Sequence, residues 1–144
     1  MWLIFSLLSA IIWGANYVLY EKIVKNISIS SLYFIDYFVG LIVFVIAALL
    51  NRNLFSDFHT ILNSKFLLIL ISANIITSLL ANLFIALAIQ SKNATLSSLI
   101  EISYPLFIII LAWLFFKENN LNLSVAIGGA FIFTGIAIIY LFNN

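Results

Sequence analysis

The chain has 144 residues, of which 65% are hydrophobic and 8% are charged. This composition leaves too little polar surface to cover a soluble globule of that size, so it predicts an integral membrane protein. The formal net charge of +1 comes from scattered single residues and excludes a basic face for nucleic acid. Because cysteine is absent, disulfides, thiolate catalysis and cysteine-ligated metal are excluded. We expect one all-α membrane domain over residues 1–144, with no cofactor and no metal.

Charged and turn residues divide the chain into five apolar spans, each close to the roughly 20 residues that cross a bilayer core of about 30 Å. The predicted helices cover residues 2–21, 31–50, 66–90, 94–116 and 122–142. The longest connection, residues 51–65, carries apolar side chains at helical spacing and predicts a short interfacial helix. His59, the only histidine, lies there, and we favour a headgroup-level residue over a metal ligand or proton carrier.

The lysine and arginine residues give no preferred orientation. Five spans place the termini on opposite sides, and each side carries three basic residues: Arg52, Lys65 and Lys117 on the N-terminal side, Lys22, Lys25 and Lys92 on the other. The positive-inside rule therefore has no bias to act on. Either the charges balance by chance and another feature sets the orientation, or the chain inserts both ways and pairs with its inverted copy.

Two predicted helices carry distinctive faces. Helix 2–21 has a polar and aromatic stripe at steps of three or four residues, which should face protein or a cavity. Its members are Ser6, Ser9, Trp13, Asn16 and Tyr20. Helix 122–142 has a flat face of small residues that suits either packing within the protomer or a dimer seam. This face consists of Ala126, Ala130, Thr134 and Ala137.

Two carboxylates lie inside predicted spans, Glu101 in helix 94–116 and Asp36 in helix 31–50. A carboxylate within a membrane costs roughly 2.5 to 3.5 kcal/mol even on a lenient insertion scale, so each is a candidate functional residue. Pro105 follows Glu101 by four residues and has no amide proton for the Glu101 carbonyl. We therefore expect a hinge or kink at Pro105.

Helical rise places the polar residues of several helices at one level, about 7 to 12 Å from the same membrane face. We take the following as candidate substrate-binding residues: Glu101, Trp13, Asn16, Tyr17, Asp36, Tyr37, Asn82 and Tyr104. For the asparagines, interhelical hydrogen bonding is the competing interpretation. For the aromatic residues, core packing or an interfacial belt competes.

The run SAIIWGANYVLYEK and the segment from ALAIQSKNATLSSLIEISYPLF to the glycine-rich last helix resemble an EamA domain of the drug/metabolite transporter superfamily. Typical members contain two such five-helix domains, inserted in opposite senses around a central site, whereas this chain has one. The resemblance therefore implies an inverted-repeat unit, and an antiparallel homodimer would supply the second unit.

The resemblance also limits which residue roles carry over. The helix 1 glutamate of the related small multidrug resistance proteins falls at about Gly14 here, so their proton-for-cation mechanism does not transfer through that position. Glu101 could supply a substitute carboxylate. Asp36 falls about where many EamA domains carry a basic residue, which argues against an anionic substrate.

We therefore expect a secondary transporter of small metabolites or organic cations in the inner (cytoplasmic) membrane, working by alternating access and proton-coupled through Glu101. The alternatives are a subunit of a heterodimeric transporter or lipid-carrier flippase, or a non-transporting scaffold or accessory subunit. An enzyme is not expected, because the chain lacks HExxH and other hydrolase or phosphate-loop motifs.

Overall fold

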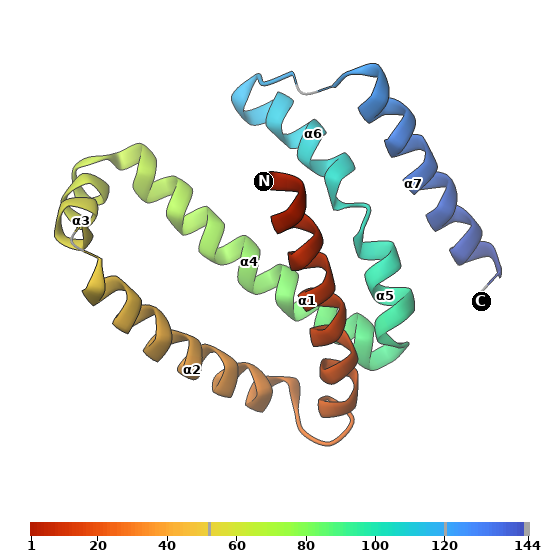
Figure 1. Cartoon of the computed structure of the whole chain (residues 1–144), viewed down its shortest axis with the longest axis horizontal. Helices are drawn as coiled ribbons and strands as arrows, with labels where there is room; N and C mark the ends of the chain where they lie inside the picture. Colours follow the sequence, from red (N-terminus) through yellow and green to blue (C-terminus); the bar gives the residue numbers. More distant parts are fainter. Residues whose placement is uncertain (52, 120, 143–144) are drawn as a thin grey trace. The chain divides into compact units, whose positions relative to one another are not determined.

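The computed structural model describes residues 1–51, 53–119 and 121–142, and these form helices and turns without a strand (Figure 1). Arg52, which entered the charge balance above, lies outside the described residues. The helices are α1 (Trp2–Ile23), α2 (Ile29–Leu50), α3 (Leu54–Asn63), α4 (Lys65–Ser91), α5 (Ala94–Glu101), α6 (Tyr104–Phe116) and α7 (Leu123–Phe142).

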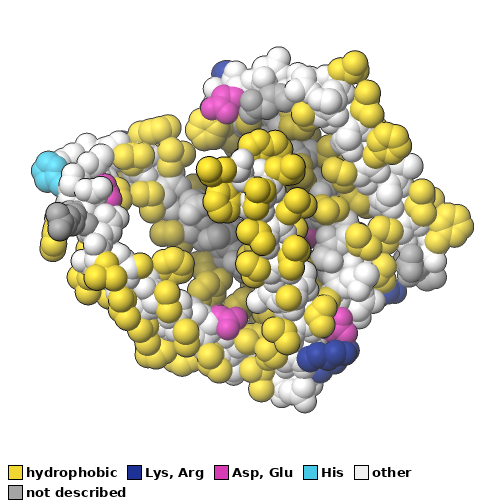
Figure 2. Space-filling view, in the orientation of Figure 1, with side chains coloured by type: hydrophobic (Ala, Val, Ile, Leu, Met, Phe, Trp, Pro, Cys, Tyr) yellow, Lys and Arg dark blue, Asp and Glu magenta, His cyan; other side chains and the backbone are white. Residues whose placement is uncertain are grey.

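Five helical segments of the described chain are long and apolar enough to cross a membrane. They are α1, α2, α4, α5 together with α6, and α7, and they contain 20 to 27 residues each. Most of their large apolar side chains are exposed, and Figure 2 shows them spread over the helices. Apolar surface on this scale needs lipid or a protein partner. The expected all-α fold with five spans is confirmed, and the protein is a multi-pass membrane protein.

The fourth span covers residues 94–116, the bounds that we expected, but it consists of two helices, α5 and α6. It is interrupted after Glu101, where the Ile102 amide closes the last turn of α5 by donating to the Ser98 carbonyl at 3.0 Å. Pro105 lies in the first turn of α6, a position where its missing amide proton costs no helical hydrogen bond. Proline thus begins a new helix here and does not bend a continuous one.

The described chain divides into two compact units. The first unit, Met1–Tyr17 with Ser91–Asn144, contains most of α1 together with α5, α6 and α7. The second unit, Val18–Gln90, contains the last turns of α1 together with α2, α3 and nearly all of α4.

In the first unit, α7 packs against both halves of the interrupted span. It contacts α5, and it comes close to α6 at Gly129, where an added Cβ would lie 2.7 Å from Leu106 Cδ2. A groove of about 460 Å³ runs between α6 and α7, and Ala126, Ala130 and Thr134 help to line it. The small side chains of α7 therefore allow a close helix approach.

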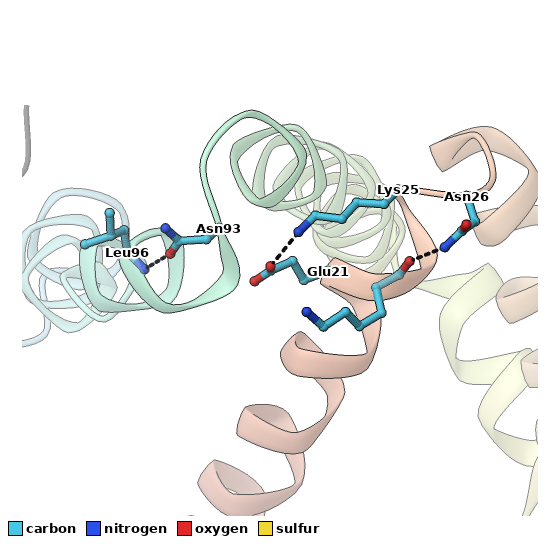
Figure 3. Close-up of polar contacts among 6 residues, drawn as sticks. Glu21, Lys25, Asn26, Asn93 and Leu96 are labelled. Atoms are coloured by element: carbon cyan, nitrogen blue, oxygen red, sulfur yellow. Dashed lines mark hydrogen bonds and ion pairs between the residues drawn. The ribbon is translucent and has the colours of Figure 1, made fainter.

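The second unit holds most of the buried apolar side chains of the described chain. They are Tyr20, Val24, Ile29, Leu32, Ala86 and Ile89. They come from the end of α1, the start of α2 and the end of α4, so the three helices pack together there. Lys25 follows the end of α1, and its Nζ lies 2.9 Å from Oε1 of Glu21, four residues earlier (Figure 3).

The connection between α2 and α4 contains the short helix α3. Phe55, Phe58 and Leu62 recur on it at helical spacing and are exposed. The side-chain amide nitrogen of Asn63 lies 3.0 Å from Nδ1 of His59, and the two side chains are hydrogen bonded. Asn63 follows His59 by one turn on the same helix. The amphipathic pattern fits a helix that lies in the interface plane, and that placement stays a prediction.

Candidate functional site

The central contact of the first unit joins Glu101 of α5 to Tyr17 of α1. The Tyr17 hydroxyl donates to Glu101 Oε2 at 2.5 Å, and both residues are partly buried. Trp13 lies one turn before Tyr17, with its ring centroid 5.6 Å from that of Tyr17 and the ring planes tilted by 48°. An ionisable group and two aromatic rings therefore lie together.

Local sequence explains why Glu101 ends a helix. The Asn93 side chain caps α5 by accepting from the Leu96 amide at 2.8 Å (Figure 3). Two turns later the chain reaches Glu101, and Pro105 cannot donate an amide proton to the Glu101 carbonyl. The helix consequently ends at the residue that carries the carboxyl group.

This placement is electrostatically unfavourable for a carboxylate. The C-terminal end of a helix carries partial negative charge from its free carbonyls, so a carboxylate there is repelled and a cation is attracted. Glu101 forms no ion pair with any other residue that the structure describes, and Tyr17 is its hydrogen-bond donor. A proton or a cationic ligand would relieve the negative charge at the end of α5.

The other candidate residues of the first unit are more exposed and form fewer contacts. Tyr104 begins α6 and is 57% exposed. Asn16 is exposed, and within the described residues its side chain has no hydrogen-bond partner. The structure thus brings Tyr17 into contact with both Trp13 and Glu101.

A second polar cluster lies in the second unit and brings together Tyr37 and Asn82. Asn82 Nδ2 donates to the Tyr37 hydroxyl at 3.3 Å, and the Tyr33 hydroxyl donates to the Asn82 main-chain carbonyl. The ring centroids of Tyr20 and Tyr33 are 5.9 Å apart, and those of Tyr33 and Tyr37 are 5.5 Å apart. Three tyrosine rings therefore form a row that links α1 and α2, and two of them bond to α4.

Asp36 belongs to the surroundings of this row. It is spaced to share one face of α2 with Tyr33 and Tyr37, and its side chain is exposed. Within the described residues it forms no hydrogen bond and no ion pair.

Sequence reasoning did not include Tyr20 and Tyr33 among the candidate site residues. The signal was present, since Tyr20 ends the polar stripe of α1, and Tyr33, Asp36 and Tyr37 are spaced to share one face of α2. The bond from Tyr33 to a main-chain carbonyl had no sequence signal, because every residue has such a carbonyl.

Comparison with known proteins agrees with the resemblance noted above. Residues 1–141 match the EamA-like transporter family. No curated protein and no solved structure matched the chain. Members of this family are membrane transporters of the drug/metabolite superfamily. Because the match covers nearly the whole sequence, the chain belongs to the EamA-like transporter family.

Proposed function

We propose that this protein moves small metabolites or organic cations across the inner membrane by alternating access, with Glu101 as the group that binds the cation. The observation that carries the proposal is the hydrogen bond from Tyr17 to Glu101 at the end of α5. A partly buried carboxylate at the negative end of a helix favours a positively charged ligand. The Trp13 and Tyr17 rings offer faces that attract such a ligand.

Proton coupling follows from the chemistry of one carboxyl group. A proton and an organic cation both neutralise Glu101, so binding of one opposes binding of the other. If the two are exchanged on opposite sides of the membrane, a proton gradient drives transport of the cation. The break between α5 and α6, at Pro105, is a suitable place for the movement that alternating access requires.

We also propose that two copies pair in antiparallel orientation. Transporters with midplane sites commonly combine two inverted units, and this chain matches one family domain over residues 1–141. The three-to-three balance of basic residues on the two sides supports insertion in both orientations. The small-residue face of α7, with Ala126, Ala130 and Thr134 along an open groove, is the proposed seam, to which Ala137 would add the next turn.

Uptake into liposomes tests the role of Glu101. The purified protein is reconstituted, a proton gradient is imposed, and uptake of labelled benzyltrimethylammonium is measured, with benzyl alcohol as a neutral competitor. We expect Glu101→Gln to lower proton-driven uptake by about 100-fold or more, because an interaction between opposite charges is lost. Asp57→Asn on α3 is the matched control and should retain uptake. Normal uptake by Glu101→Gln with an unchanged pH dependence would contradict the proposal.

Orientation can be measured directly, because the chain contains no cysteine. Ser56→Cys in α3 and Asn26→Cys between α1 and α2 place single thiols on opposite sides of the membrane. Intact cells are then labelled with a membrane-impermeant thiol reagent. We expect each variant to be labelled in about half of the molecules if the chain inserts both ways. Labelling of one variant only would exclude the antiparallel homodimer and favour an oppositely oriented partner chain.

A further inference from the structure

The second unit contains a buried hydroxyl group that the helix packing does not explain. Tyr20 is 8% exposed, and its hydroxyl makes no well-aligned hydrogen bond among the described residues, with the Tyr33 hydroxyl as its polar neighbour. The Tyr33 hydroxyl beside it donates to the Asn82 carbonyl. Leaving a buried polar group without a good hydrogen bond costs free energy, so such a group calls for a specific reason.

An unpaired carboxylate lies in the same place. Asp36 is seven residues into α2, about 10 Å from the start of that helix. It follows Tyr33 by three residues and directly precedes Tyr37, a spacing that puts it on the α2 face that carries both rings, and it has no ion-pair partner in the described part of the chain. The ion pair of this unit joins Lys25 to Glu21 and leaves Asp36 without a cation.

The tyrosine row supplies what an organic cation needs beside a carboxylate. The rings of Tyr20, Tyr33 and Tyr37 follow one another at centroid distances of 5.9 and 5.5 Å. Aromatic faces attract quaternary and protonated amines, and the attraction grows when water is excluded. Tyr37 accepts from Asn82 and so keeps its own hydroxyl proton for another acceptor. The cluster therefore offers one negative charge, ring faces and two unused hydroxyl protons.

We infer that Asp36, Tyr20 and Tyr37, all in the second unit, form a second binding site, built from other residues than the Glu101 contact, for a small organic cation that carries a hydrogen-bond acceptor. The cation lies against Asp36 and the rings, and the Tyr20 and Tyr37 hydroxyls donate to the acceptor. The inference rests on the proposed function for the charge of the ligand, but not for the place where it binds.

Binding stoichiometry separates the two sites. Titration calorimetry of the purified full chain with benzyltrimethylammonium should give two equivalents per chain, because the cation alone satisfies the carboxylate and ring faces of either site. Asp36→Asn should remove one equivalent and leave the affinity of the other unchanged, and Asp57→Asn should keep both. Retention of both equivalents by Asp36→Asn would overturn the inference. Loss of both by the folded variant would also overturn it, since that result means one shared site.

The Glu101→Gln variant distinguishes a failure of this inference from a failure of the proposed function. If it removes the equivalent that Asp36→Asn keeps, both ideas stand. If it leaves two equivalents while Asp36→Asn leaves one, the Glu101 proposal fails and the second site stands. If the wild-type chain takes up a single equivalent that only Glu101→Gln removes, the second site is wrong.

Tyr20→Phe distinguishes ligand binding from a role in packing. The phenyl ring keeps the ring contact and removes only the unsatisfied hydroxyl, so the ligand-free protein should melt at the same temperature or higher. Binding of choline, whose hydroxyl oxygen is an acceptor, should weaken several-fold at the Asp36 site. Tyr140→Phe on α7, a tyrosine that is 63% exposed, should change neither quantity. A lower melting temperature with unchanged choline affinity would show that Tyr20 only packs and would overturn its assignment to the site.

Discussion

The two units of this chain each contain a tyrosine-centred polar cluster, and the clusters differ in what holds them together. In the first unit, Tyr17 bonds to an ionisable carboxyl group at an interrupted helix. In the second unit, Tyr33 and Tyr37 bond to the main chain and the amide of Asn82, all on continuous helices. Burial follows the same division, since the second unit holds most of the buried apolar side chains of the described residues.

The difference teaches how the two clusters can serve different purposes. A contact to Glu101 changes with every proton or cation that binds the carboxyl group, so the α1–α5 contact can be switched. A contact between neutral groups does not respond to charge in this way, and an interhelical bond of this kind mainly adds stability. We therefore expect substitutions in the first unit to affect transport most, and substitutions at Asn82 to affect stability most.

Tyr17→Phe should produce the largest effect of the variants that keep Glu101. A hydrogen bond to a charged group contributes roughly 1.5–3 kcal/mol, so we expect benzyltrimethylammonium uptake to fall about tenfold or more. The melting temperature should change little, because the ring contact with Trp13 remains possible. Tyr140→Phe serves as the control. Unchanged uptake in Tyr17→Phe would mean that the Tyr17–Glu101 bond does not contribute to transport.

Asn82→Ala should destabilise the second unit by about 1 kcal/mol, as expected for one interhelical side-chain hydrogen bond in a membrane. Asn74→Ala is a matched control, because Asn74 lies two turns earlier on the same face of α4 and its side chain has no hydrogen-bond partner among the described residues. Unfolding in detergent, followed by circular dichroism, measures both. Equal losses of stability would show that the bond to Tyr37 contributes nothing specific.

The sequence was sufficient to predict the five spans, because the length and hydropathy of each segment determine whether it can cross a bilayer. It was also sufficient to relate Glu101 to Pro105, since a missing amide proton is a property of proline itself. It predicted a hinge or kink at Pro105 but did not predict that α5 ends at Glu101 and α6 begins at Tyr104, because a proline is compatible with a bent continuous helix as well as with two helices.

Contacts between distant helices were harder to predict. Tyr17 and Glu101 were both candidate substrate-binding residues, but the hydrogen bond between them was not predicted. Helical spacing identifies a face but not the neighbour that this face meets. Tyr33 was missed for the same reason, since its acceptor is a main-chain carbonyl of α4.

Pro105→Ala tests whether the interruption of the fourth span matters. Alanine restores an amide proton and favours one continuous helix, so stability should rise by up to about 1 kcal/mol and uptake should fall several-fold. Pro105→Gly also restores the proton but disfavours a helix by about 1 kcal/mol relative to alanine, so it should retain more uptake. If both variants lose uptake equally, the proline ring is needed for a reason other than the interruption.

The smallest expected effect concerns the packing of α7 in the first unit. Alanine in place of glycine normally stabilises a helix by about 0.5–1 kcal/mol, and Gly128→Ala should show this gain because nothing lies within 4 Å of its added Cβ. At Gly129 the added Cβ would lie 2.7 Å from Leu106 Cδ2, so the Leu106 side chain must move and the gain should be offset. We therefore expect Gly129→Ala to be less stable than Gly128→Ala by about 0.5–1 kcal/mol in detergent unfolding. Equal stability of the two variants would mean that Leu106 on α6 can move away from the added Cβ without a loss of stability. The close approach of α6 and α7 would then not stabilise the interrupted span.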